Sequence, residues 1–393
     1  MYEKILLCLD NSEDSLKAAS VAASLAAETG AQAIALHVYA ALLHNDRFME
    51  METTLPEKYR EENELKRQRE IHASLIKRGL EIISDSYAAP VARTFEEKGL
   101  TLIPAKREGR HFEEILKETT EGSYGLVILG RTGLGRTSSG RIGGVSMRIA
   151  RECTGADVLV VQNDILAEAS SPIVVCVDGS ASAYYAVKQA ASLSKLLNAR
   201  LTAVAAFDPE YHRVAFKSIS GVLSNEDAKL FRFKEQEKLH DEIINSNLAE
   251  IYKGYLNAAK EIAATEGVKM ETVLLEGKAS DEIVKYAAST KPSLLVTGRF
   301  GRMSIQSDTL GMTAENILRE TAVNVLIASG SLEVKKNEED PLLWENAAEE
   351  LFKKIPGFVR SMVRKMAEDE ARRLGLRKVT VKLLEDLRRK ISP

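Results

Sequence analysis

Two pairs of glycines have the spacing in this sequence that is most suggestive of ligand chemistry. Gly130 and Gly133 follow a short apolar run, and Gly143 and Gly144 come nine residues later, where a helix is predicted to begin. Glycine allows a backbone to approach a ligand closely, and the free N–H groups and dipole at a helix start favour a phosphate. We therefore predict phosphate contact here; the alternative is a glycine-rich turn without a ligand.

Two well-known phosphate-binding loops do not fit this pattern. A Walker loop ends in Gly-Lys-Ser or Gly-Lys-Thr, and no lysine follows these glycines. A dinucleotide-binding fold carries Gly-x-Gly-x-x-Gly after its first strand, where this chain has Asp10-Asn11-Ser12. Both assignments therefore fail on position as well as on pattern.

An internal repeat makes the glycine loop more informative. The segment 4–12 recurs as 172–180, 168 positions further along the chain, and both copies end a predicted strand with an aspartate, Asp10 and Asp178. The loop glycines recur at the same spacing as Gly298, Gly301 and Gly311. Such agreement in order and register predicts two homologous domains, 1–164 and 170–330. A charged stretch ending in proline then precedes a third unit, 342–393.

Short apolar runs alternate with helical stretches in each repeat, which predicts a parallel sheet with helices on both faces. In the first repeat the predicted strands are 5–9, 33–39, 100–103, 125–130 and 157–161. In the second they are 172–177, 203–207, 268–275, 293–297 and 325–328. The long charged segments 56–78 and 225–266 predict elongated crossover helices, with a lid or partner surface as the alternative.

These features together resemble the universal stress protein family, over residues 1–164 and 170–330. The resembling pattern is a strand that ends in Asp, followed after the fourth strand by Gly-x2-Gly-x9-Gly. The resemblance implies two tandem α/β/α domains of the Rossmann-like, universal-stress-like (HUP) class. Each has a five-stranded parallel sheet that often binds ATP and pairs through its last strand.

The resemblance also implies which residues would hold ATP, with or without Mg²⁺. In the family's ATP-binding branch, the positions that hold adenine and sugar match Asp10 and Val38. The loop positions that hold the phosphates match Leu129, Gly130, Arg131, Gly133, Gly143, Gly144, Val145 and Ser146. A weaker second site would comprise Asp178, Gly298, Gly301, Gly311 and Thr313.

The sequence departs from the family pattern after the third loop glycine, where the family has Ser or Thr. Gly144 stands there in the first repeat, and loss of one hydroxyl hydrogen bond should cost about 0.5–1.5 kcal/mol. In the second repeat Met312 places a long apolar side chain there, Ala314 replaces the later serine, and Asp308 adds a negative charge. We therefore expect repeat one to bind nucleotide and repeat two to be weakened or empty.

Several other residues have simpler interpretations. Asp10 could instead cap the following helix, for which Ser12 is also a candidate. Cys8 lies on a buried strand and is expected to be a core residue, and His37 a packed histidine. His111 stands near a helix start, where a ligand role is a minor alternative.

The unit 342–393 is locally basic, with 13 Lys or Arg against 8 Asp or Glu from Leu343 onward. Three helices are predicted, the first with Trp344 on its apolar face, the second starting near Pro356 and burying Met366, and the third capped by Thr380. The unit resembles the small C-terminal domain of the B subunit of light-independent protochlorophyllide reductase, without that reductase's cluster-binding cysteines. This resemblance implies a docking or ligand-sensing module; the alternative is a basic helical tail.

We thus expect a cytoplasmic, nucleotide-binding regulatory protein of the stress response, with the two repeats paired within the chain and a protein partner at the C-terminal module. The alternatives are an interaction scaffold with degenerate pockets and, more weakly, a nucleotidyl-transferring enzyme. We assign no catalytic residue and no metal site, and leave slow ATP hydrolysis and a homodimer open. The net charge of −3 and the absence of a secretory signal or a long apolar run predict no membrane or specific nucleic-acid partner.

Overall fold

The computed structural model describes most of the chain. The described residues are 1–135, 141–164, 172–210, 245–302, 309–333, 343–355 and 359–391 apart from 375 and 377, together with the single positions 214, 218 and 222. They form two compact units, Met1–Glu333 and Val334–Pro393, which are described separately. Asp308, Pro356 and Gly375 lie outside the described residues.

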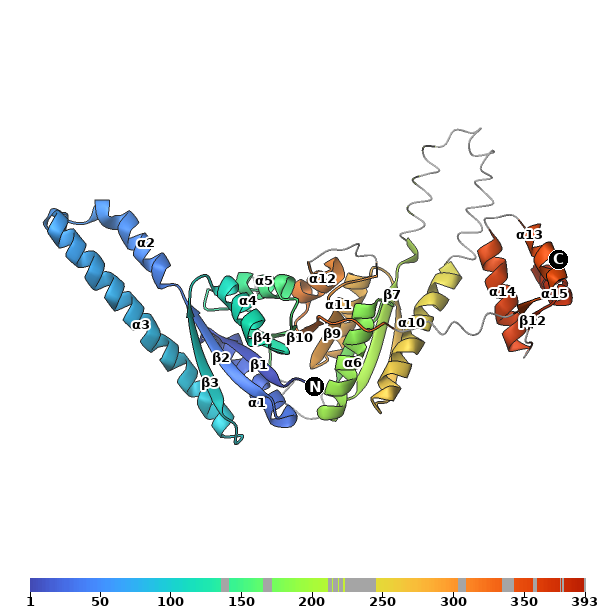
Figure 1. The fold of residues 1–393 in the computed structure, drawn as a ribbon, viewed down its shortest axis with the longest axis horizontal. Helices are drawn as coiled ribbons and strands as arrows, with labels where there is room; N and C mark the ends of the chain where they lie inside the picture. Colours follow the sequence, from blue (N-terminus) through green and yellow to red (C-terminus); the bar gives the residue numbers. More distant parts are fainter. Residues whose placement is uncertain are drawn as a thin grey trace. The chain divides into compact units, whose positions relative to one another are not determined.

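A ten-stranded sheet forms the centre of the first unit, in the order β3-β2-β1-β4-β5-β10-β9-β6-β7-β8 (Figure 1). The strands of repeat one are β1 (Lys4–Leu9), β2 (Gln32–Tyr39), β3 (Leu102–Glu108), β4 (Leu126–Gly130) and β5 (Asp157–Val161). Those of repeat two are β6 (Ile173–Cys176), β7 (Leu201–Phe207), β8 (Met270–Glu276), β9 (Leu294–Gly298) and β10 (Asn324–Ala328). All neighbours within a repeat are parallel, whereas β5 and β10 join the repeats in antiparallel fashion. The predicted tandem parallel-sheet fold and its pairing through the last strand are confirmed.

Helices cover both faces of this sheet. Repeat one has α1 (Glu13–Thr29), α2 (Ala41–Met51), α3 (Glu62–Glu96), α4 (His111–Gly122) and α5 (Gly144–Glu152), with short 3-10 turns at Glu52–Thr54 and Glu57–Tyr59. Repeat two has α6 (Ala181–Leu196), α10 (Asn245–Thr265), α11 (Ala279–Thr290) and α12 (Met312–Glu320). In repeat one α1 and α3 pack together on one face, and α4 and α5 on the other.

The local signals explain where the first helix begins and ends. The backbone N–H of Ser15 donates to Ser12 Oγ at 3.2 Å, so Ser12 is the N-cap of α1. Gly30 ends the helix in the left-handed region, with φ of +71°. Ser180 caps α6 in the same way through the N–H of Ala183. In both repeats a serine side chain therefore caps the helix that follows the first strand.

Two predicted elements have wrong boundaries. The third strand does not stop at Pro104 but runs from Leu102 to Glu108, because β3 is an edge strand and an edge tolerates the missing N–H of proline. The charged helix predicted over 56–78 is α3, which extends to Glu96, well beyond the charged stretch. Its outer part continues past the sheet, with α2 folded back along it (Figure 1).

Two buried arginines hold the repeats together reciprocally. Arg131 donates to the carbonyls of Leu318 and Arg319, both at 2.7 Å, at the end of α12. Arg299, which is fully buried, donates to the carbonyl of Ala150 at 2.9 Å and also to those of Arg151 and Cys153, at the end of α5. A positive charge at a helix C-terminus satisfies free carbonyls and opposes the helix dipole. Burial lowers the pKa of both arginines.

A buried carboxylate reinforces the same junction. Asp157 accepts hydrogen bonds from the Tyr2 hydroxyl at 2.8 Å, the Gln189 side chain at 3.0 Å and the Ser329 N–H at 2.8 Å. Burial raises the pKa of Asp157, and these hydrogen bonds oppose the rise. The junction is thus a specific polar interface as well as a strand pairing.

In the second unit the described residues form three helices around a small core. They are α13 (Asn346–Lys353), α14 (Arg360–Arg373) and α15 (Val381–Ile391), with two short paired strands, β11 (Leu343–Trp344) and β12 (Lys378–Val379). The N–H of Leu383 lies 3.4 Å from Thr380 Oγ1, which supports the predicted cap. Trp344 lies on β11 rather than on the first helix, and Met366 is exposed while Ala367 fills the core. The strand pair was not predicted, and α14 buries Ala367 and Ala371 instead of Met366.

Candidate functional site

A cavity of about 660 Å³ lies at the carboxyl ends of the strands of repeat one. Its walls come from the ends of β1, β2 and β4, the first turns of α4 and α5, and the inner side of α3. Ligands of open α/β sheets bind at this edge. The predicted residues that line it are Asp10, Val38, Leu129, Gly130, Gly133, Gly143, Gly144, Val145 and Ser146. The fold therefore brings residues from widely separated segments to one cavity.

Arg131 is the predicted site residue that the fold places elsewhere. Its side chain points into the junction between the repeats, where it binds the end of α12. Its backbone is also engaged, because its N–H donates to Val161 O at 2.7 Å and its carbonyl accepts from Gly143 at 2.8 Å. Arg141, at the other end of the loop, lines the cavity and is exposed. Among the described loop residues, Arg141 is thus the arginine whose side chain can meet an anion.

Asp10 ties the glycine loop to the end of β1. Its Oδ1 accepts from the N–H of Ser12 at 3.0 Å, and its Oδ2 accepts from the N–H of Leu134 at 3.2 Å. The helix cap is Ser12, so Asp10 closes a local turn instead of capping α1. This clamp fixes the loop while the carboxylate still faces the cavity.

A second acidic residue anchors the loop, and sequence reasoning missed it. Asp14 is buried, and its Oδ2 accepts from the N–H of Thr132 at 3.0 Å and from its hydroxyl at 2.6 Å. Ser12 Oγ donates to the carbonyl of Thr132 at 3.1 Å. Acidic residues are common in the first turn of a helix because they interact favourably with the helix dipole. The position of Asp14 therefore did not indicate that it holds the loop. The spacing of one turn from Asp10 is the signal that could have revealed it.

Packing explains much of the glycine pattern. A Cβ on Gly130 would lie 2.7 Å from backbone atoms of Asp14 and Ser15, and one on Gly133 would lie 2.5 Å from Asp10 Oδ2. In repeat two a Cβ on Gly298 would likewise lie 2.7 Å from backbone atoms of Ser182 and Ala183, in the first turn of α6. These glycines are therefore required by the fold, and their recurrence does not by itself indicate a ligand.

The start of α5 has the geometry of an anion site. Gly143 is the N-cap residue and has no side chain to occupy the first N–H groups of the helix. A Cβ on Gly144 would meet no atom within 4 Å, so the cavity is open at this point. Ser146 Oγ donates to the carbonyl of Gly130 at 2.8 Å and closes the loop. The hydroxyl of Ser146 is thus engaged within the protein.

Three histidines also line the cavity, His37, His44 and His111. His37 Nδ1 lies 2.7 Å from Ser84 Oγ, and its ring packs edge-on against Tyr87 with centroids 5.1 Å apart. Burial, with a smaller contribution from the charge of His111, lowers the pKa of His37. His111 is the first residue of α4 and is exposed at the cavity wall. The cavity therefore has one imidazole packed inside, whose protonation burial disfavours, and further imidazoles at His44 and His111.

Repeat two keeps the loop clamp. Asp178 Oδ1 accepts from the N–H of Ser180 at 3.0 Å, and Oδ2 accepts from the N–H of Arg302 at 2.9 Å. Gly311 caps α12 as Gly143 caps α5. Thr313 is exposed in the first turn of α12.

The residues above the clamp are different in repeat two. Ser84 and His37 correspond, 168 positions further on, to Tyr252 and Ala205. The Tyr252 ring lies 5.4 Å from that of Tyr255, and a Cβ on Gly179 would lie only 2.6 Å from the Tyr255 ring. Tyr255 corresponds to Tyr87, which lines the cavity of repeat one, so Tyr252 is the ring at this place that repeat one lacks. Met312 is 80% exposed at the position of Gly144.

Two absences concern the described part of the chain alone. Within it, no group of three or more His, Cys, Asp or Glu side chains is arranged to hold a metal ion. In the same residues, no helix combines the length and the apolar character that a membrane span requires.

Comparison with known sequences agrees with this architecture. The family model described as the universal stress protein family matches residues 1–162 and 170–329, and one described as proto-chlorophyllide reductase 57 kD subunit matches residues 344–388. A universal stress protein of Methanocaldococcus jannaschii is 34% identical over 86 residues, which is 22% of this chain and 51% of that protein. One of Synechocystis is 34% identical over 71 residues, which is 18% of this chain and 25% of that protein. These alignments span about half and a quarter of the relatives' lengths.

Comparison with solved structures identifies the same fold. A universal stress protein from Archaeoglobus fulgidus superposes with a TM-score of 0.53 at 16% identity, covering 84% of this chain and 99% of that one. A universal stress protein solved in complex with cAMP covers 41% of this chain and 98% of its own, at 24% identity and a TM-score of 0.27. Since the family model spans both repeats and their sheet is the family's fold, this chain belongs to the universal stress protein family.

Proposed function

We propose that repeat one binds an adenine nucleotide, ATP with or without Mg²⁺, as a regulatory ligand in the stress response. The observation that carries this proposal is the cavity at the sheet edge, where Asp10, Val38 and the open start of α5 face the same space. Adenine would meet the apolar wall formed by residues such as Val38. The phosphates would meet the first N–H groups of α5 and the Arg141 guanidinium.

We further propose that repeat two binds nucleotide weakly or not at all. Tyr252 stands where repeat one has Ser84, and Met312 replaces the open position of Gly144. Nucleotide in repeat one could then bias the junction, because the loop residue Arg131 is bonded directly to α12 of repeat two. The free, buried cysteines fit a cytoplasmic setting.

The C-terminal unit is the proposed site of a protein partner. Trp344 and Phe352 lie with ring centroids 4.9 Å apart, and the Arg364 guanidinium lies over both rings. Trp344 Nε1 donates to Glu368 at 3.1 Å, which fixes the indole. Aromatic side chains and arginine are the residue types enriched where proteins bind one another.

The proposal is tested by calorimetric titration of the full chain with ATP and by extraction of nucleotide that copurifies with it. We expect about one nucleotide per chain. Gly144→Met introduces the residue that repeat two has at this position. A Cβ there meets no protein atom within 4 Å, so the fold should survive. ATP affinity should fall about tenfold or more, about 1.4 kcal/mol.

The matched control is Gly155→Met, at another exposed glycine with open space around it and outside the cavity lining. It should bind like the wild type. An interaction scaffold without nucleotide is the second candidate, favoured by the packing explanation of Gly130 and Gly133. Absence of both copurified nucleotide and titration heat would establish the scaffold and reject nucleotide binding.

A further inference from the structure

Arg299 of repeat two holds the helix whose start faces the cavity of repeat one. Its guanidinium donates to the carbonyls of Ala150 and Arg151 at 2.9 and 3.1 Å, and also to that of Cys153. These three residues belong to the last turn and the C-cap of α5. The first turn of the same nine-residue helix has the geometry that suits an anion. One helix therefore connects a residue of repeat two with the ligand site of repeat one.

Repeat two itself fixes the position of Arg299. The backbone N–H of Arg299 donates to the carbonyl of Ala328 at 3.0 Å, and its own carbonyl accepts from the N–H of Gly311 at 2.9 Å. Its Nε donates to Ser329 Oγ at 3.2 Å. The side chain is fully buried, so it has little freedom to turn away from α5. Arg299 is therefore a rigid support that one repeat offers to the other.

The charge of Arg299 affects an anion at the far end of α5 through the helix dipole. A cation at the end of a helix and an anion at its start each interact favourably with that dipole. The nine residues of α5 span about 14 Å. Ile149 and Ala150 are inaccessible to solvent, so salt screens the interaction less than it would on an open surface. A guanidinium also keeps its charge when it is buried.

The two loops and the two helices form a closed ring of hydrogen bonds. The carbonyl of Arg131 accepts from the N–H of Gly143, the N-cap of α5, while its guanidinium holds the end of α12. The carbonyl of Arg299 accepts from Gly311, the N-cap of α12, while its guanidinium holds the end of α5. Each helix is thus held at its start by one loop and at its end by the other. The start of α5 is therefore linked to the loop of repeat two by direct hydrogen bonds.

We propose that Arg299 is a positioning residue for the nucleotide site of repeat one, which repeat two thereby supports although its own site is weak. The proposal rests on the proposed binding of ATP by repeat one and names a source of its affinity. It gives repeat two a role in ligand binding that requires no open pocket there. Because coupling between two sites is reciprocal, ATP in repeat one should also strengthen the hydrogen bonds around Arg299.

Calorimetric titration of the full chain with ATP tests this role. Arg299→Gln removes the charge and should weaken ATP binding about threefold to tenfold relative to the wild type. Arg299→Lys keeps the charge but loses the fork of donors, so it should weaken binding by a smaller factor. Circular dichroism establishes that both variants are folded at the temperature of the titration.

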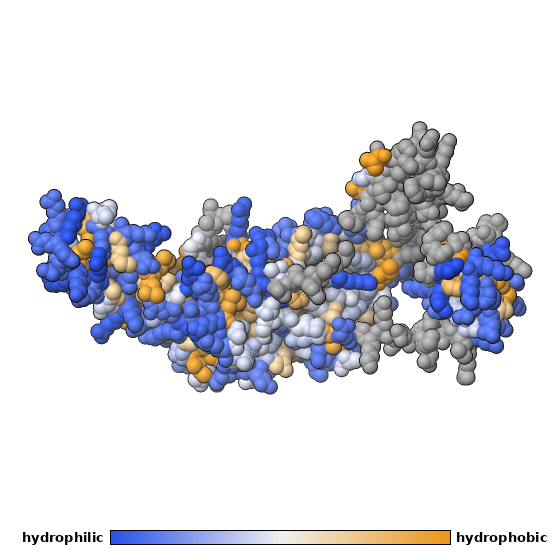
Figure 2. Space-filling model, turned by 45° about the horizontal axis from the view of Figure 1, so that its top comes forward, coloured by the Kyte–Doolittle hydropathy of each residue, from blue (hydrophilic) through white to orange (hydrophobic). Residues whose placement is uncertain are grey.

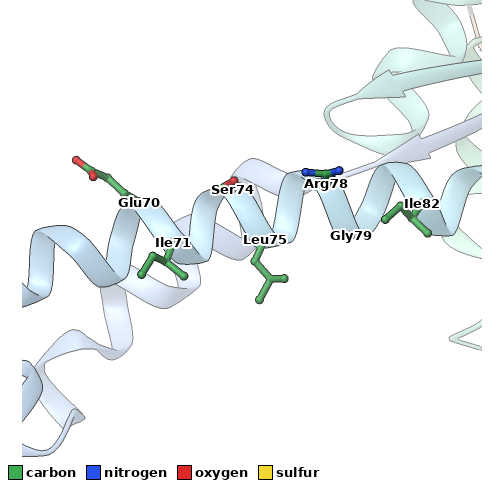
Figure 3. Close-up of a pocket in the computed structure, with 7 residues that line it drawn as sticks. All are labelled: Glu70, Ile71, Ser74, Leu75, Arg78, Gly79 and Ile82. Carbon is green, nitrogen blue, oxygen red and sulfur yellow. The ribbon is translucent and has the colours of Figure 1, made fainter.

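Two control variants separate this effect from the loss of a charge and from damage to the junction. Arg78→Gln removes an exposed guanidinium from α3, at a shallow pocket away from the cavity (Figure 3). The hairpin of α2 and α3, at the left of Figure 2, is mainly hydrophilic, so glutamine should be tolerated there. Tyr2→Phe removes a hydrogen bond to Asp157 at the junction, a bond that does not involve α5. Both controls should bind ATP like the wild type.

Hydrogen exchange of the wild type provides a second test that needs no variant. Saturating ATP should slow exchange of the amides of Arg299 and Gly311 in repeat two, as well as those of α5. The amides of β8, at the far edge of the sheet, should exchange unchanged and serve as the internal reference.

Two results would overturn the role of Arg299 and leave ATP binding by repeat one intact. One is an Arg299→Gln variant that binds ATP as tightly as the wild type. The other is protection by ATP that stops within repeat one. A wild type that does not bind ATP at all would overturn both this proposal and the nucleotide site.

Discussion

The two repeats share the structure that shapes a nucleotide loop and differ in the space above it. Asp10 and Asp178 make the same clamp to the loop backbone, and the loop glycines pack against the same helix starts. In repeat one this frame opens into a cavity, whereas in repeat two Tyr252 on α10 stands where repeat one has Ser84. The two repeats therefore differ in a residue opposite the loop as well as in the loop itself.

The same comparison applies to the junction, where symmetry is only partial. Arg131 and Arg299 are equivalent residues that bind equivalent helix ends. Arg151, however, pairs with Glu315 at 2.5 Å, while the position equivalent to Glu315 in repeat one is Met147. The two surfaces have thus kept equivalent buried hydrogen bonds and diverged at the edge, where only repeat two supplies the acid of a partly buried ion pair.

The largest expected effect is on stability, and it tests whether the loop glycines are packed equally tightly in both repeats. Gly130→Ala and Gly298→Ala each put a Cβ 2.7 Å from backbone atoms, and each should lower the free energy of unfolding by about 1–3 kcal/mol. Gly144→Ala is the control, since a Cβ there meets no neighbour, and it should leave stability nearly unchanged. Chemical denaturation measures all three. Tolerance of Gly298→Ala alone would show that the frame of repeat two has relaxed.

A smaller effect is expected from opening repeat two. Tyr252→Ser with Met312→Gly copies the residues of repeat one onto the retained clamp. If side chains over the loop decide binding, nucleotide affinity at repeat two should rise about tenfold, about 1.4 kcal/mol, and calorimetry should approach two sites per chain. Met312→Gly alone controls for the loop and should give a smaller gain. If the double variant does not bind nucleotide more tightly, the difference in affinity between the repeats must come from the loop itself.

The sequence predicts the strand ends and the glycine loop better than the residues that face them across the cavity. The strand ending in Asp10 and the loop start at Gly130 are local patterns, so their positions at the sheet edge follow from the repeat and the strand order. Asp14 was missed because its partner Thr132 is remote in the sequence. The substitution of Ser84 by Tyr252 becomes meaningful only once α3 and α10 are known to pack over the strand ends. Local sequence patterns do not reveal contacts between residues that are far apart in the chain and belong to no recognisable motif.

The smallest expected effect concerns pH and belongs to repeat one alone, since Ala205 stands in repeat two where repeat one has His37. Burial lowers the pKa of His37 in the folded chain below the ordinary value that the unfolded chain restores. The unfolded chain therefore binds more protons as the pH falls through about 6.5, and the free energy of unfolding should decline between pH 7 and pH 5. His37→Gln should flatten this decline in denaturation curves, by less than the effects above. His72→Gln, a histidine outside the cavity lining, controls for loss of an imidazole as such. A His37→Gln profile as steep as the wild type would assign the decline to other groups and leave the cavity without a proton-linked residue.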